Sequence, residues 1–142
     1  MKKLFLFVSA VALTVTLNSC SSDDEDGGDS ISFKIGGVTK SFNTIVAAEG
    51  GGTVFVSAYN GTASDPGESV SFTIPSGETG ANRVDNFSYT SPGGNDFTGN
   101  PLTSDVTTNS GSLVKGTFSG TLDGGVSTSD LVMTDGKFDI TY

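Results

Sequence analysis

The single cysteine of this 142-residue chain, Cys20, has the most distinctive chemical setting of any side chain in it. Lys2 and Lys3 precede an apolar run of 14 residues, and this run closes on Leu17-Asn18-Ser19-Cys20. A positive end, a short apolar stretch and small residues at the cut are the three parts of a secretory signal. The run is shorter than the ~20 residues that a membrane-spanning helix needs. We therefore predict that residues 1–19 are a lipoprotein signal peptide and that Cys20 becomes the lipidated first residue.

The competing interpretation is an ordinary cleaved signal followed by a chance cysteine. Asn18 departs from the small residue that usually stands at its position, whereas Leu17 and Ser19 fit the lipidation signal. A lipidated Cys20 would carry a thioether-linked diacylglycerol and an acylated amino group, and two or more acyl chains give stable anchoring. The predicted partner of the chain is thus a membrane, reached through lipid. The mature domain would contain no disulfide, because Cys20 is the only cysteine.

Carboxylates are the next candidates for chemistry, because paired carboxylates hydrolyse glycosidic bonds. Outside residues 20–29 the only glutamates are Glu49, Glu68 and Glu78, and each stands next to, or one residue away from, glycine or proline. We expect all three in exposed turns, where nothing raises a pKa for acid–base work. Histidine is absent, which excludes Ser-His and Cys-His nucleophiles and histidine metal ligands. The sequence therefore predicts a protein that is not an enzyme and that uses no cofactor.

Two further sets of residues could bind a ligand. Loop acids could hold calcium, which takes six to eight oxygens, but no calcium-loop pattern is present and turn formation explains them better; they are Asp85, Asn95, Asp96, Asp123, Asp130 and Asp135. A candidate ligand surface consists of Tyr59, Arg83, Phe87 and Tyr89, with Phe97 nearby. Aromatic residues at strand positions more often pack in a core or in cross-strand pairs, and we favour that interpretation. No metal site is predicted.

Charge restricts the partners. Cleavage of the signal leaves five basic residues against sixteen acidic ones, and the five stand one at a time along the chain. Because phosphate binding needs clustered lysine and arginine, we predict no nucleic-acid partner. The abundance of Gly, Ser, Thr and Asn is typical of strands and turns and not of helices.

Apolar residues alternate with period two along most of the chain after residue 30. About eight or nine short strands are expected, at 31–35, 38–47, 53–59, 69–74, 87–89, 106–108, 113–122, 131–133 and 138–142. Expected turns between them include Gly36-Gly37, Gly99-Asn100-Pro101 and Asp135-Gly136. The predicted fold class is all-β, an antiparallel β-sandwich or a small up-and-down barrel, and the pattern does not separate these two. Residues 30–142 are expected to form this single domain.

Residues 20–29 are small and acidic, which is typical of a flexible tether. Their serines and acids directly after the cysteine resemble the surface-export signal of Bacteroidota lipoproteins, which implies the outer face of the outer membrane. Asp29-Ser30-Ile31 also resembles the short O-glycosylation motif of that phylum, so Ser30 is a candidate glycosylation site.

A second resemblance lies in the last third of the chain. The segments Gly116-Thr117-Phe118-Ser119-Gly120-Thr121-Leu122 and Asp135-Gly136-Lys137-Phe138-Asp139-Ile140 resemble the closing hairpin of small uncharacterised Bacteroidota surface lipoproteins. That family implies a fold type and a location, and it implies no activity. The sequence thus predicts a lipid-anchored envelope protein with a non-catalytic binding or structural role. The alternative is a surface glycan-binding accessory protein in nutrient capture, and a glycan or another envelope protein is the expected partner.

Overall fold

The computed structural model describes residues 28–62 and 65–142, and these residues fold almost entirely into antiparallel strands. The strands are β1 Ser30–Ile35, β2 Val38–Phe42, β3 Thr44–Gly50, β4 Thr53–Thr62, β5 Asp65–Pro75, β6 Gly80–Ala81, β7 Asp85–Thr90, β8 Asp96–Ser110, β9 Leu113–Asp123 and β10 Leu131–Thr141. One short 3₁₀ turn, Gly125–Ser127, connects β9 to β10. The predicted all-β class is confirmed.

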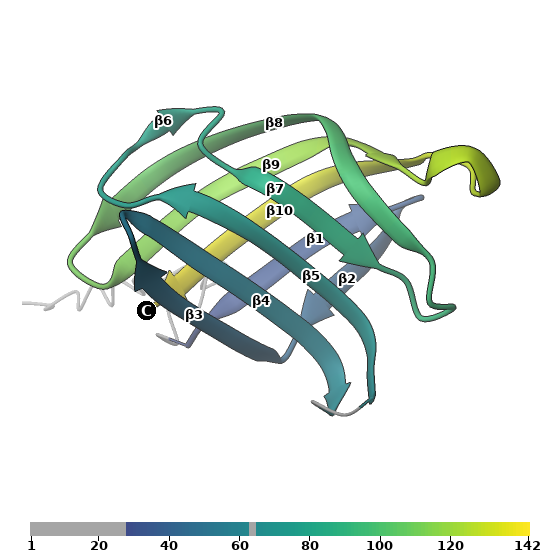
Figure 1. Cartoon of the computed structure of the whole chain (residues 1–142), viewed down its shortest axis with the longest axis horizontal. Coiled ribbons are helices and arrows are strands. Elements are labelled where there is room, and N and C mark those ends of the chain that lie inside the picture. The colour runs from purple at the N-terminus through teal and green to yellow at the C-terminus, as the bar shows by residue number, and fades with distance from the viewer. Residues whose placement is uncertain (1–27, 63–64) are drawn as a thin grey trace, which may run out of the picture.

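The strands form one sheet in the order β2-β1-β10-β9-β8-β7-β5-β4-β3, with β6 paired to β8. Neighbouring strands are mostly consecutive in the chain, as in an up-and-down meander. The exceptions are β1, which pairs with β10, and the short β6, which pairs with β8 and lets β5 pair with β7. The sheet curves around a common interior until its two edge strands, β2 and β3, approach each other (Figure 1). It is therefore a nearly closed barrel.

The wall is not closed by backbone pairing between β2 and β3. These strands are consecutive and separated only by Asn43, where the chain leaves its partner β1 and takes β4 as the new partner. The sequence analysis treats 38–47 as one strand with Phe42 and Val46 on the same face, and this is wrong. Phe42 is buried, whereas Val46 lies on the outer face of β3, because the corner at Asn43 resets the alternation.

Alternating apolar side chains fill the interior of the barrel. Eight aromatic residues belong to this core: Phe33, Phe42, Phe72, Phe87, Tyr89, Phe97, Phe118 and Phe138. Phe72 stacks on Phe87 with ring centroids 6.0 Å apart, and Phe33 meets Tyr89 edge to face at 5.6 Å. Strands from opposite sides of the barrel thus share one aromatic cluster.

Two expected turns are irregularities inside long strands. Asp135-Gly136 lies within β10, where the register with β9 shifts between Met133 and Gly136. Gly99-Asn100-Pro101 lies within β8, where the register with β9 shifts between Gly99 and Leu102. Glycine, asparagine and proline are found at bulges as well as at turns, so residue type alone did not separate the two.

Glycines on the inner face of β9 and β10 make room for two phenylalanine rings. Gly116 pairs with Phe138, and Gly136 pairs with Phe118, so each strand supplies one ring and one gap. A Cβ at Gly116 would lie 2.5 Å from the Phe138 ring, and one at Gly136 would overlap the Phe118 ring. This exchange explains why glycine and phenylalanine alternate in the two C-terminal segments that resemble a family hairpin.

Candidate functional site

The residues of the predicted ligand surface do not form one surface. Phe87 and Tyr89 point into the barrel and are buried, as is Phe97. Tyr59 is half-buried on the outer side of β4, and Arg83 is exposed between β6 and β7, where its guanidinium lies 2.8 Å from the Glu78 carboxylate. Core packing, the interpretation favoured by the strand pattern, holds for Phe87, Tyr89 and Phe97.

Of the two predicted modification sites, the structure describes only Ser30. Cys20 and the signal peptide lie outside the described residues. Ser30 is the exposed first residue of β1 and stands opposite Asp139 of β10. The Asp29 carboxylate accepts a hydrogen bond of 2.8 Å from the Thr141 amide, which ties the start of β1 to the end of β10.

Two of the loop acids hold the turn after β9, whereas Asp135 lies within β10. The Asp123 carboxylate accepts from the Gly125 amide at 2.7 Å, and the Asp130 carboxylate accepts from the Gly124 amide at 3.4 Å. Asp135 forms an ion pair of 3.0 Å with Lys34. Within residues 28–62 and 65–142, no three acidic, histidine or cysteine side chains gather in a way that could hold a metal ion.

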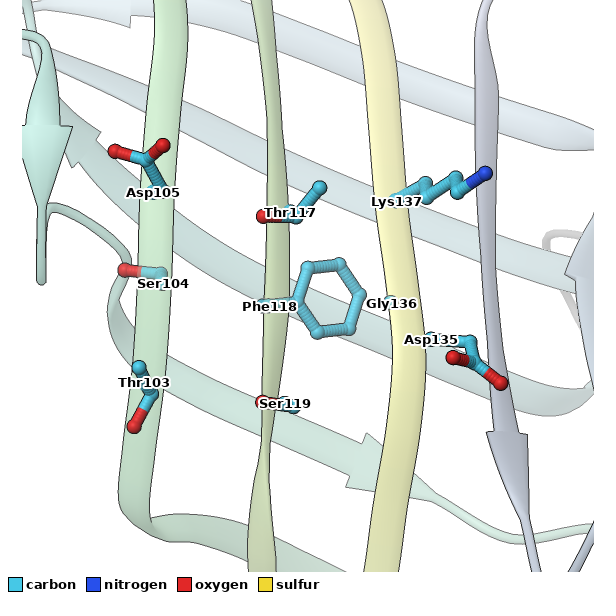
Figure 2. Close-up of a pocket in the computed structure, with 9 residues that line it drawn as sticks. All are labelled: Thr103, Ser104, Asp105, Thr117, Phe118, Ser119, Asp135, Gly136 and Lys137. Atoms are coloured by element: carbon cyan, nitrogen blue, oxygen red, sulfur yellow. The ribbon is translucent and has the colours of Figure 1, made fainter.

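A shallow hollow of about 330 Å³ lies on the outer wall, over β8, β9 and β10. One row of its lining is Asp105, Thr117 and Lys137, which are paired neighbours on the three strands and lie at the top of Figure 2. A second row contains Thr103 and Ser119. The floor of the hollow is formed at Phe118 and Gly136. The Phe118 ring points into the barrel beside Gly136, which has no side chain, so no side chain projects outward from the wall there.

The chemistry of this hollow is that of weak polar recognition. Two carboxylates, one ammonium group and the hydroxyls of Thr103, Thr117 and Ser119 surround a partly apolar floor. The lysine reaches toward β1 and not over the hollow (Figure 2). Hydroxyls and charged groups around an apolar floor suit an amphipathic polyol such as a sugar ring. The sequence analysis did not group these residues into a site, because they lie on three strands and only the register brings them together.

A second polar cluster lies inside the barrel, beside the corner at Asn43. The Glu68 carboxylate of β5 accepts a hydrogen bond of 2.5 Å from the Tyr89 hydroxyl of β7. Its same oxygen lies 2.9 Å from the Lys40 ammonium of β2. Its other oxygen accepts from the Asn60 side-chain amide of β4 at 3.3 Å. One buried carboxylate thus joins four strands.

Asn60 is held at both ends of its side-chain amide. Its nitrogen also donates to the Ser41 carbonyl at 2.8 Å, and its oxygen accepts from the Asn43 backbone amide at 3.3 Å. Both contacts cross from β4 to the chain around the corner between β2 and β3. The Glu68 cluster, defined as Lys40, Asn60, Glu68 and Tyr89, therefore joins β2 to β4 and β5 where backbone pairing does not.

The environment of this cluster shifts two acidities in opposite directions. Burial raises the pKa of Glu68, but the hydrogen bond from Tyr89 and the charge and hydrogen bond of Lys40 outweigh burial, so the pKa of Glu68 lies below its usual value. Burial, and then the hydrogen bond and charge of Glu68, raise the pKa of the Tyr89 hydroxyl above its usual value. The resting state is therefore a carboxylate that accepts from a neutral tyrosine.

The prediction that all three glutamates lie in exposed turns is wrong for Glu68, and for Glu49 only the exposure holds, because Glu49 lies within β3. Glu49 and Glu78 are exposed, whereas Glu68 lies within β5 and is buried. It is in phase with the core residues Val70, Phe72 and Ile74. This spacing of two residues from the core positions was the sequence evidence for a buried Glu68. The neighbouring Gly67 suggested a turn instead.

An apolar strip is exposed on the outer face of β3 and β4. Phe55 is 53% exposed and Val46 is 57% exposed. Ala48 stands opposite Phe55, and Tyr59 follows on the same side of β4. The outer wall thus offers an aromatic surface, with Tyr59 as its only member from the predicted set.

Comparison with family models, with curated proteins and with solved structures finds no match for this chain. In the described part of the chain, no helix is both long enough and apolar enough to cross a bilayer.

Proposed function

We propose that this protein is a lipid-anchored domain of the bacterial cell envelope with a non-catalytic binding or structural role. The observation that carries the proposal is the sequence around Cys20, a thiol placed directly after a secretory signal and followed by a small, acidic tether. The resemblance of residues 21–29 to the surface-export signal of Bacteroidota lipoproteins supports the outer face of the outer membrane. The resemblance of the C-terminal hairpin to surface lipoproteins of that phylum points the same way.

The barrel supports a role for the outer wall and not for the interior. Its interior is filled by the aromatic core, so binding would use outward side chains. The negative charge of the chain favours solubility and weakens contact with anionic surfaces. The domain would then stand off the membrane at the end of its tether.

Radioactive palmitate tests the anchor. Cells that express the full chain should incorporate label into it, and the protein should stay with membranes in plain buffer. Cys20→Ala should lose both properties, whereas Ser19→Ala keeps a small residue at the cut and should retain both. An unlabelled wild-type chain that washes off membranes would contradict the proposal.

The hollow over β8, β9 and β10 favours a second candidate function, glycan binding in nutrient capture. Asp105 would accept hydrogen bonds from sugar hydroxyls, and Thr103, Thr117 and Ser119 would donate and accept. Soluble oligosaccharides titrated into the full chain should release heat, with weak affinity in the range of about 0.1–1 mM. Asp105→Ala should weaken binding about tenfold, which corresponds to the loss of about 1.4 kcal/mol.

Asp85→Ala is the matched control for this titration, because Asp85 is exposed on β7, outside the hollow. Equal affinity in wild type and Asp105→Ala would remove the hollow as the binding site. No heat with any oligosaccharide would leave the structural role as the function of the domain.

A further inference from the structure

The Glu68 cluster contains the reactants of a covalent bond. Lys40 supplies a primary amine, Asn60 supplies a carboxamide, and the Glu68 carboxylate contacts both through its two oxygens. An amine is a competent nucleophile once it has lost its proton, and a carboxylate in hydrogen-bond contact can take that proton. We propose that Lys40 and Asn60 react with each other to form an intramolecular isopeptide bond, with Glu68 as the acid–base group.

The first requirement is that the two reactants lie near each other. The Lys40 ammonium and the Asn60 side-chain amide contact the two oxygens of the same carboxylate, so Glu68 bridges them. The site is partly removed from water, since the side chain of Lys40 is 23% exposed and that of Glu68 is 11% exposed. Holding two reactants near each other is a main source of rate in such reactions.

The orientation of Asn60 meets the second requirement. Its carbonyl oxygen accepts from the Asn43 backbone amide, which would stabilise negative charge on that oxygen when an amine adds to the carbon. Its nitrogen, the leaving group, donates to Glu68, which is placed to return a proton to it. The Asn43 amide thus lies at the Asn60 oxygen, where negative charge would develop. The Glu68 carboxylate lies at the Lys40 nitrogen and at the Asn60 nitrogen, where protons move.

The reaction balances without another reagent. The Lys40 ammonium gives one proton to Glu68, and the free amine adds to the Asn60 side-chain carbonyl carbon. The bond from that carbon to the amide nitrogen then breaks, and Glu68 passes its proton to the departing nitrogen, which leaves as ammonia. The lysine nitrogen gives its second proton to this ammonia and keeps its third proton as the amide N–H. The products are a secondary amide between the two side chains and an ammonium ion. The first transfer is uphill, because Glu68 rests as a carboxylate, but a reaction that happens once in each molecule tolerates a slow rate.

The bond would join β2 to β4 where the wall of the barrel lacks backbone pairing. It would close a loop of the chain from residue 40 to residue 60, and a cross-link of this kind stabilises a fold by restricting the unfolded chain. The mature domain contains no cysteine pair that could do this. The proposal concerns self-modification and is independent of what the outer wall binds.

Fragment masses test the proposal. A glutamate-specific protease cuts the unfolded full chain after Glu49, between the two reacting residues, and separates residues 26–49 from residues 50–68. After about a day at 37 °C the two fragments should remain joined, with a mass about 17 Da below their sum because ammonia is lost. Two separate fragments of unchanged mass would overturn the proposal.

Four variants sharpen this test. Glu68→Gln removes the cut after residue 68, so residues 26–49 and residues 50–78 should be recovered as separate fragments. Glu78→Gln, at an exposed glutamate, should leave the bond intact. Lys40→Arg keeps a cation beside Glu68 but has no amine that acylates readily, so it should also give separate fragments even if Glu68→Gln fails to fold. Asn60→Asp should lose water and not ammonia, a deficit of about 18 Da. A joined pair in Lys40→Arg would overturn the assignment of the nucleophile.

Thermal unfolding supplies a second measurement. Lys40→Arg should melt more than about 5 °C below the wild-type chain, because the closed loop is lost.

Discussion

Tyr89 illustrates how one residue serves both the core and the polar cluster. Its ring packs against Phe33 and Phe97, and its hydroxyl donates to Glu68. A buried hydroxyl needs such a partner, because an unsatisfied one costs about 1–3 kcal/mol. Strand phase predicted the ring correctly as core, but no sequence pattern could predict its partner, which lies 21 residues away.

The raised pKa of Tyr89 leads to a prediction about alkaline pH. Tyr89 should ionise at a higher pH than an ordinary tyrosine in the folded chain, because burial and Glu68 disfavour its charged form. Absorbance of tyrosinate against pH should show this delayed step, and Tyr89→Phe should remove it. Tyr59→Phe is the control and should leave the delayed step in place.

The same shift has a defined sign for stability. A folded pKa above the unfolded value contributes stability that is fully present below about pH 10 and is lost as pH rises further. Unfolding midpoints in denaturant should therefore fall more steeply above pH 10 in the wild-type chain than in Tyr89→Phe. Parallel curves for the two chains would contradict this origin of the shift.

At the scale of elements, the packing of β9 against β10 depends on two pairs in which a glycine of one strand makes room for a phenylalanine ring of the other. Period-two alternation predicted the inward face of Val114, Phe118 and Leu122, and it holds. It did not predict that Gly116 and Gly136 lie inside, because glycine adds nothing to an apolar pattern. Only the register between the strands shows which ring fills which gap.

Gly136→Ala should therefore lower the free energy of unfolding by about 2–4 kcal/mol, because its Cβ would overlap the ring and carbonyl of Phe118. Gly50→Ala is the matched control in β3, since its Cβ would stand in ordinary contact, 3.9 Å from Phe55. Denaturant unfolding measures both, and the control should stay within about 0.5 kcal/mol of wild type. Equal effects in the two variants would show that the close packing at Gly136 relaxes easily.

Local pattern also explains which elements were predicted poorly. The hairpins at Gly36-Gly37 and at residues 51–52 follow tight turns at positive φ, and their strands were expected at nearly the right residues. The corner at Asn43 and the bulges in β8 and β10 are set by partners on other strands. Those partners come from distant parts of the chain, so the irregular residues resembled ordinary turns.

For the whole molecule, alternation predicted an all-β meander but left sandwich and barrel open. The choice depends on how β1 meets β10, a pairing between residues about 100 positions apart. The candidate site was predicted less well than the fold. The hollow and the Glu68 cluster both depend on register across several strands, and register is not visible in one sequence without a hairpin to fix it.

The placement of the basic residues has a consequence for digestion by trypsin-like enzymes outside the cell. Of the five basic residues after the signal, four lie within strands, and only Arg83 stands in a connection, between β6 and β7. A protease must draw an extended stretch of backbone into its cleft, which a paired strand does not release without local opening. One exposed bond, after Arg83, is thus the main point at which such an enzyme can cut the native domain.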